Sequence, residues 1–201
     1  MLSPATDPGF ASSPLHGEAV QARLVKQVLA RVKRHGLALD VGAHIGTWTV
    51  PLAARFEQVI AFEPVAANRA CLEANVAWMK NVIVLPVAVS DRNGTGSMAL
   101  PGDNSGTYCL LHGTDVLVTT LDVVVHSPVD FIKLDVEGAE GAVLMGAEKI
   151  LRSSRPAVFF EDNGLGERHY GPSWVDPKVV LQRNGYRPAV RLAKNELWLP
   201  D

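Results

Sequence analysis

The chain has 201 residues, of which 47% are hydrophobic and 20% are charged, and its formal net charge is −2 at pH 7. This length and composition predict one globular domain over residues 1–201 with a sizeable buried core. The near-neutral charge gives no electrostatic argument for a nucleic acid partner. No apolar run reaches the roughly 18 residues of a membrane span, so we expect no membrane partner either.

The N-terminal segment and the cysteines favour a reducing compartment. Residues 1–16 are rich in Pro, Ser and Gly, without a basic start or a long apolar core. They are therefore predicted to be flexible and not to form a signal peptide. Cys71 and Cys109 form no Cys-x-x-Cys pair, so neither a disulfide framework nor a zinc site is expected. We expect a cytoplasmic protein.

Hydrophobic periodicity divides the rest of the chain into alternating strands and helices. In the N-terminal region 17–36, a helix is predicted from about Glu18 to Arg34, closed by His35-Gly36. The strands predicted after it are 37–41, 59–62, 82–85 with 87–89, 95–100, 116–120, 129–135, 157–160, 186–192 and 197–199. Helices are predicted at 47–55, 66–79, from Asp122, at 139–152 and at 175–184, with loops at 101–114 and 164–172.

This alternation predicts an α/β fold with a mostly parallel sheet, helices on both faces and an antiparallel C-terminal edge hairpin. In such a sheet, ligands bind at the carboxyl ends of the strands. The residues that follow each strand are therefore the candidate site residues.

The first two strands enclose a glycine turn of the nucleotide-binding kind. Asp40 precedes Gly42, Ala43, His44 and Gly46, and Glu63 follows the second strand. Glycines allow a tight turn close to a ligand, and an acid about 20 residues on can accept ribose hydroxyls. His44 and Thr47 occupy positions where the dehydrogenase fingerprint has glycines. With an acid before it, the turn favours an adenosyl group that carries an amino acid, as in S-adenosylmethionine (SAM), over a pyrophosphate.

Acids also follow the later strands. The strand at 129–135 ends in Asp135-Val136-Glu137-Gly138-Ala139-Glu140, and the strand at 157–160 ends in Glu161-Asp162-Asn163. Acids are costly to bury alone, so a cationic ligand, a metal or protonation must offset them. They could also simply cap the following helices, where negative charge is favourable.

The segment Ile132-Lys133-Leu134-Asp135-Val136-Glu137-Gly138-Ala139-Glu140, with the turn Asp40-Val41-Gly42-Ala43-His44-Ile45-Gly46, resembles the FkbM-type family of SAM-dependent methyltransferases. The resemblance covers roughly residues 37–163 and includes Thr119-Thr120-Leu121-Asp122 and Glu161. It implies the class I methyltransferase sheet of seven strands, and methyl transfer to an oxygen of a sugar or natural-product-like acceptor.

The resemblance also implies roles for individual residues. Asp40, Gly42 and Gly46 would hold the methionine end of SAM, Glu63 the ribose, and Asp91 would lie near the adenine, with Asp135 facing the methyl donor. The complete set of cofactor residues that we predict is Asp40, Gly42, Ala43, His44, Gly46, Glu63, Pro64, Asn68, Ser90, Asp91 and Asp135.

A hydroxyl acceptor must lose its proton, to a general base or with the help of a metal. Asp135, Glu137 and Glu161 are the predicted catalytic residues, and His169 is a further candidate base. We assign no metal, although these three carboxylates together could hold a hard divalent ion.

Two other classes of function stay open at this point: an NAD-type oxidoreductase on a similar sheet, and a non-catalytic module that binds the cofactor. The expected partner is a small-molecule or carbohydrate acceptor. Residues 1–36, 101–115 and 164–176 are expected to form its site, because acceptor sites on such folds are built from loops and additions. We also expect the loop at 101–114 to act as a lid, because loops of that length often do.

Overall fold

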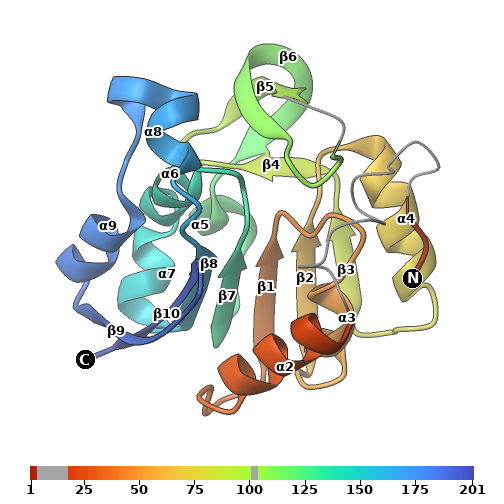
Figure 1. Ribbon diagram of the computed structural model, residues 1–201, viewed down its shortest axis with the longest axis vertical. Coiled ribbons are helices and arrows are strands. Elements are labelled where there is room, and N and C mark those ends of the chain that lie inside the picture. Colours follow the sequence, from red (N-terminus) through yellow and green to blue (C-terminus); the bar gives the residue numbers. More distant parts are fainter. Residues whose placement is uncertain (4–17, 101–103) are drawn as a thin grey trace.

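The computed structural model describes residues 1–3, 18–100 and 104–201. Its centre is a seven-stranded sheet in the order β3-β2-β1-β7-β8-β10-β9 (Figure 1). Neighbouring strands run parallel, except that β10 runs antiparallel to both β8 and β9. The strands are β1 (Leu37–Val41), β2 (Gln58–Phe62), β3 (Val82–Leu85), β7 (Phe131–Leu134), β8 (Ala157–Glu161), β9 (Tyr186–Leu192) and β10 (Asn195–Pro200). The predicted α/β class and the antiparallel C-terminal hairpin are confirmed.

Side chains alternate along each strand, so the sheet has two apolar faces. Ala38 and Phe131 share one core with Val28 and Leu52, which lie in α2 (Glu18–Leu29) and α3 (Thr49–Ala53). The neighbouring positions on the strands pack on the opposite face, against the second group of helices. That group comprises α5 (Leu121–Val124), α6 (Glu140–Met145), α7 (Glu148–Ser153) and α9 (Pro177–Arg183). The faces are thus set by the period of two along β1 and β7.

A smaller sheet lies beyond the carboxyl ends of β1 and β2 (Figure 1). It contains β4 (Val87–Val89), β6 (Cys109–Thr119) and β5 (Gly94–Ala99), in that order. The helices α4 (Ala66–Val76) and α8 (Leu165–Tyr170), with the short 3-10 helix η2 (Gly171–Ser173), complete the described elements. The smaller sheet therefore covers part of the carboxyl edge of the main sheet.

Several predicted boundaries are wrong. The first helix ends at Leu29 instead of Arg34, residues 109–114 are the first half of β6 instead of loop, and residues 165–170 form α8 instead of loop. Residues 109–111 of β6 pair with residues 97–99 of β5, a long-range contact that local sequence does not encode, whereas β4 pairs with residues 117–119 of β6. Of the loop predicted at 101–114, residues 101–103 lie outside the described residues and 109–114 belong to β6, and the role of this loop as a lid stays a prediction.

The helix predicted at 139–152 is broken into α6 and α7 at Gly146. A Cβ at this position would lie 2.1 Å from the Ser90 carbonyl oxygen, so only glycine fits there. The Asp122 carboxylate then accepts the backbone N–H groups of Lys149 and Ile150, at 2.9 and 3.0 Å. The Asp122 side chain of α5 thus satisfies backbone N–H groups in the first turn of α7.

The prediction of a flexible segment at 1–16 falls mainly on residues outside the described part. Trp48 is buried against Phe159, whereas Trp78 is 75% exposed. No helix in the described part of the chain has the length and apolarity needed to cross a membrane.

Candidate cofactor and active site

A cavity opens at the carboxyl ends of β1 and β2, beneath the smaller sheet. Its lining comes from the glycine turn, the end of β2, α4, the small sheet and the end of β7. The residues are Val41, Gly42, His44, Phe62, Glu63, Pro64, Asn68, Val87, Ala88, Val89, Met98, Ser105, Gly106, Tyr108, Leu110, Asp135, Val136 and Ala139.

The glycine turn has a left-handed backbone at alternate positions. The φ angles are +75° at Gly42, +52° at His44 and +95° at Gly46. A Cβ on Gly42 would lie 1.9 Å from the Asp135 carbonyl oxygen, so this glycine lets the turn pass directly over the end of β7. The backbone N–H groups of Gly42 and Ala43 both bond to the Phe62 carbonyl oxygen, at 3.1 and 3.0 Å. The predicted turn is thus clamped between β2 and β7.

A buried ion pair anchors this turn to the sheet. Asp40 and Lys133 face each other in register on β1 and β7, and Lys133 Nζ lies 3.1 Å from Asp40 Oδ1. The same ammonium donates to the Gly42 carbonyl oxygen at 2.8 Å and lies 3.6 Å from Asp135 Oδ2. Thr49 Oγ1 donates to Asp40 Oδ2 at 2.6 Å. Burial lowers the pKa of Lys133, but attraction to Asp40 and Asp135 outweighs it, so this pKa is raised and the lysine is charged.

Glu63 lies at the floor of the cavity with 4% of its surface exposed. Its two carboxylate oxygens accept the backbone N–H groups of His44, at 2.8 Å, and Val65, at 2.9 Å. Burial raises its pKa to about 7, against these hydrogen bonds, which lower it. Each oxygen keeps a second lone pair for a ligand hydroxyl.

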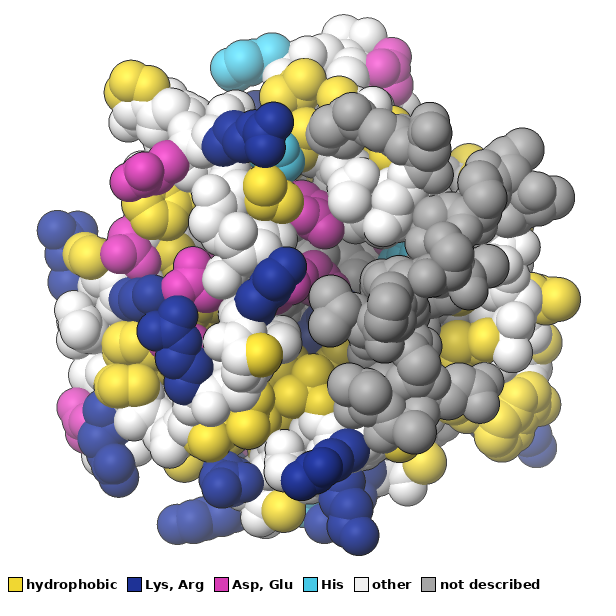
Figure 2. Space-filling model, in the orientation of Figure 1, with side chains coloured by type: hydrophobic (Ala, Val, Ile, Leu, Met, Phe, Trp, Pro, Cys, Tyr) yellow, Lys and Arg dark blue, Asp and Glu magenta, His cyan; other side chains and the backbone are white. Residues whose placement is uncertain are grey.

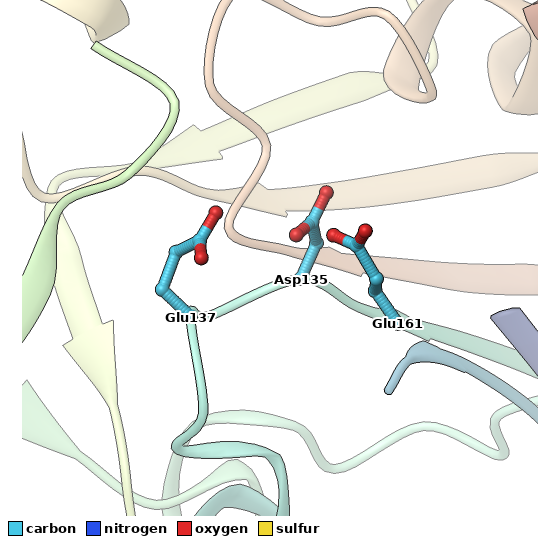
Figure 3. Close-up of side chains that lie close together, drawn as sticks. All are labelled: Asp135, Glu137 and Glu161. Atoms are coloured by element: carbon cyan, nitrogen blue, oxygen red, sulfur yellow. The ribbon is translucent and has the colours of Figure 1, made fainter. Parts of the chain in front are cut away.

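Three carboxylates gather where β7 and β8 end. One oxygen from each of Asp135, Glu137 and Glu161 lies within 4.8 Å of the others, and Figure 3 shows these side chains side by side. Burial, followed by repulsion from Asp135, raises the pKa of Glu137 to about 8 and that of Glu161 to about 7. Figure 2, in the orientation of Figure 1, shows acidic side chains near the centre of the face that it presents. We call these three residues the acidic rim.

The rim is held in place by contacts that the sequence alone did not indicate. Glu137 has a left-handed backbone, with φ of +54°, and its carboxylate accepts from Asn163 Nδ2 at 3.2 Å. Its carbonyl oxygen accepts from His169 Nδ1 at 2.9 Å. Glu140 accepts the backbone N–H groups of Val136 and Gly138, at 3.1 and 3.3 Å. A non-glycine residue in this conformation is strained and needs such support.

Six of the eleven predicted cofactor residues line the cavity, and five do not: Asp40, Ala43, Gly46, Ser90 and Asp91. Ser90 and Asp91 are absent from the lining; Ser90 Oγ donates to Asp91 Oδ1 at 3.1 Å, and Asp91 is exposed. The sequence analysis missed Thr49, Lys133, Glu140 and Asn163 as supporting residues, and Met98, Ser105, Tyr108 and Leu110 as cavity walls. Side chains alternate between the two faces of a strand, and Lys133 lies opposite Asp40 on the neighbouring strand. This alternation is the signal in the sequence that could have identified Lys133.

The fold is that of the class I methyltransferases. The structure is similar to the methyltransferase FkbM from Methylobacillus flagellatus KT, with a TM-score of 0.58 and 16% identity; the match covers 96% of this chain and 48% of that one. It is also similar to precorrin-6y C5,15-methyltransferase from Geobacter metallireducens GS-15, with a TM-score of 0.56, 12% identity and coverage of 97% and 91%. A Streptococcus mutans structure in complex with SAH, the demethylated cofactor, matches with a TM-score of 0.52, 12% identity and coverage of 88% and 94%.

The family model of the methyltransferase FkbM domain matches residues 40–188, and the chain belongs to this family. It spans about half the length, 48%, of the Methylobacillus FkbM protein. A search of curated proteins gives no significant match. Membership in a methyltransferase family speaks against the NAD-type oxidoreductase alternative.

SAM is the cofactor of this class, and the residues present fit it. The cavity contains the buried acid Glu63 for a ribose, the partly exposed acid Asp135 for a cationic sulfur, and a glycine whose Cβ position is closed by backbone. It also contains the Asn68 side-chain carbonyl oxygen, which is buried and has no hydrogen-bond partner among the described residues. A buried acceptor without a partner is costly and is expected where a ligand supplies the donor.

Proposed function

We propose that this chain transfers the methyl group of SAM to a hydroxyl oxygen of a small-molecule or carbohydrate acceptor. The observation that carries the proposal is the position of the acidic rim beside the cofactor cavity: Asp135 belongs to both. Three carboxylates next to a methyl donor provide both charge for the sulfonium and a base for the acceptor.

The cofactor half of the proposal uses the glycine turn and β2. Gly42, Ala43, His44 and Gly46 bring the backbone close to the methionine end, with Asp40 and its partner Lys133 holding the turn beneath them. Glu63, Pro64 and Asn68 line the part of the cavity assigned to the adenosine. Ser90 and Asp91 are proposed only as outlying contacts of the adenine.

The catalytic half uses the acidic rim. SAM supplies an electrophilic methyl group on a positively charged sulfur. Asp135, whose side chain is 38% exposed, lines the cavity and offers the charge that complements this sulfur. Glu161 or Glu137 takes the proton of the acceptor hydroxyl, because carboxylates with pKa values of about 7 and 8 are stronger bases than ordinary ones.

A divalent ion held by the same three residues is the second candidate, favoured by the 4.8 Å limit on the separation of their oxygens. Such an ion would lower the pKa of a bound hydroxyl and would take over the task of the base. Acids without ligand geometry do not identify an ion, so we retain proton transfer to a carboxylate as the main proposal.

The proposal is tested by measuring SAH formation with acceptors that present hydroxyl, amine or thiol groups, and with RNA as a further class. We expect turnover with hydroxyl acceptors, loss of turnover in Glu161→Gln or Glu137→Gln, and no effect of EDTA. Turnover with amines or RNA alone would overturn the assignment to oxygen. Loss of activity in EDTA, restored by Mg²⁺, would favour the metal. SAH binding without any turnover would favour a non-catalytic module.

A further inference from the structure

One buried polar atom in the cofactor cavity has no hydrogen-bond partner among the described residues. The Asn68 side chain is 2% exposed, lines the cavity and lies in the first turn of α4. Its Nδ2 donates to the Ser105 carbonyl oxygen at 3.0 Å, which fixes the orientation of the amide, since a carbonyl oxygen can only accept. Its Oδ1 is the atom that accepts from no described residue.

The segment that Asn68 contacts forms the outer wall of the cavity. Ser105, Gly106 and Tyr108 line it, and Ser105 Oγ lies 2.7 Å from His44 Nε2 in the glycine turn. The segment is braced from within: the Gly106 N–H donates to Asn104 Oδ1 at 2.9 Å. Two residues of the cofactor cavity, His44 and Asn68, therefore hold one wall residue from opposite elements, the glycine turn and α4.

We propose that Asn68 is a ribose-reading residue that ties cofactor binding to this wall: its Oδ1 accepts a hydrogen bond from a ribose hydroxyl of the cofactor while its Nδ2 holds Ser105. The inference rests on the proposed use of SAM and adds to it a specific contact and its consequence. A carbonyl oxygen needs a donor, which a hydroxyl provides. The neighbouring Glu63 oxygens each already accept one backbone N–H group, so a second acceptor for a two-hydroxyl sugar is chemically useful.

The closing experiment measures binding of SAH and of three analogues by calorimetry, so that no acceptor is needed. Two analogues each lack one ribose hydroxyl, as the 2′-deoxy and the 3′-deoxy form, and the third replaces the adenine amine with a carbonyl. We expect Asn68→Ala to weaken SAH binding roughly tenfold, the size of one hydrogen bond left unmade. For one deoxy form the substitution should cost no more than about threefold, whereas for the carbonyl analogue it should cost the same tenfold.

Asn81→Ala is the matched control. Asn81 Nδ2 also donates to backbone carbonyl oxygens, those of Ala53 and Phe56, at 2.8 and 3.0 Å, but Asn81 does not line the cavity. Its substitution should leave SAH affinity unchanged. Hydrogen exchange in segment 104–108 gives a second readout: SAH should slow it in the wild-type protein and in the control, and less so in Asn68→Ala.

The outcomes separate the inference from the proposed function. Wild-type protein that binds SAH while Asn68→Ala binds every ligand equally well overturns the role of Asn68 and leaves the function standing. A tenfold loss that disappears only with the carbonyl analogue moves the contact to the adenine and overturns the ribose assignment. Failure of the wild-type protein to bind SAH overturns the proposed function itself.

Discussion

The two groups of acids on the carboxyl edge of the sheet are balanced in different ways. Asp40 is fully buried and has an ammonium and a hydroxyl as partners. Glu137 has mainly other carboxylates near it, and at Glu161 burial and repulsion from Asp135 outweigh attraction to Lys194 and Lys133. The first arrangement fixes the shape of the glycine turn. The second leaves unbalanced negative charge, which raises pKa values and is available to a ligand or a proton. A buried acid is thus structural where the fold supplies its counter-charge and available for chemistry where it does not.

The largest effect is expected on stability, from removing Lys133, the counter-charge of Asp40. Lys133→Met leaves Asp40 buried without its cation and should lower the free energy of unfolding by about 3–5 kcal/mol. Arg34→Met is the matched control, because Arg34 pairs with Asp130 through a side chain that is 60% exposed. Its cost should stay below about 1 kcal/mol in urea denaturation. Equal losses in the two variants would refute the structural role given to the buried pair.

The second-largest effect is expected on cofactor binding, from a change at Glu63. Glu63→Gln replaces a carboxylate that accepts two backbone N–H groups and should weaken SAH binding by about tenfold or more, since one amide position can no longer accept. Glu73→Gln on α4, where the side chain is 59% exposed, serves as control and should bind SAH normally. Calorimetry with both variants checks this, and unchanged affinity in Glu63→Gln would remove it from the cofactor site.

The acidic rim should make stability depend on pH. Glu137, with a folded pKa of about 8, holds its proton in the native state at pH values where the unfolded chain, with a pKa of 4.5, has lost it. The native state therefore binds more protons between these values, and stability falls as pH rises from about 4.5 to about 8. Glu161, with a pKa of about 7, acts in the same direction.

Glu137→Gln removes one of these groups and should reduce the loss of stability between pH 5 and pH 8.5 by about 1–2 kcal/mol, allowing for partial solvation. Urea denaturation at the two pH values measures it. Glu148→Gln, in an exposed pair with Arg152, is the control and should keep the wild-type pH dependence. An unaltered slope in Glu137→Gln would mean that the rim is solvated like an ordinary surface.

The smallest effect is expected outside the cavity. Asp91 has a side chain that is 39% exposed and pairs with Arg92 Nη1 at 3.8 Å. Asp91→Asn should change SAH affinity by no more than about threefold, since exposed charges contribute little. A larger loss in calorimetry would show that the adenine end of the cofactor reaches beyond the lining described above.

Much of this site was predictable from sequence because covalent order and strand direction fix it. Asp40, Glu63, Asp135 and Glu161 each follow or end a parallel strand, so their meeting at one edge follows from the alternation of strands and helices. Ends of helices and strands were less predictable, as at Leu29 and Gly146, because tertiary contacts decide them.

The sequence by itself determined the class of fold, the glycine turn and which acids reach the carboxyl edge, since these depend on local pattern and chain order. Only the tertiary structure decided which acid has a counter-charge. Lys133 contacts Asp40 and the Gly42 carbonyl oxygen across 93 and 91 positions of chain, and β6 closes over the cavity through pairing with two other strands. Electrostatic balance depends on distances in space, and the sequence specifies those distances only through the complete fold.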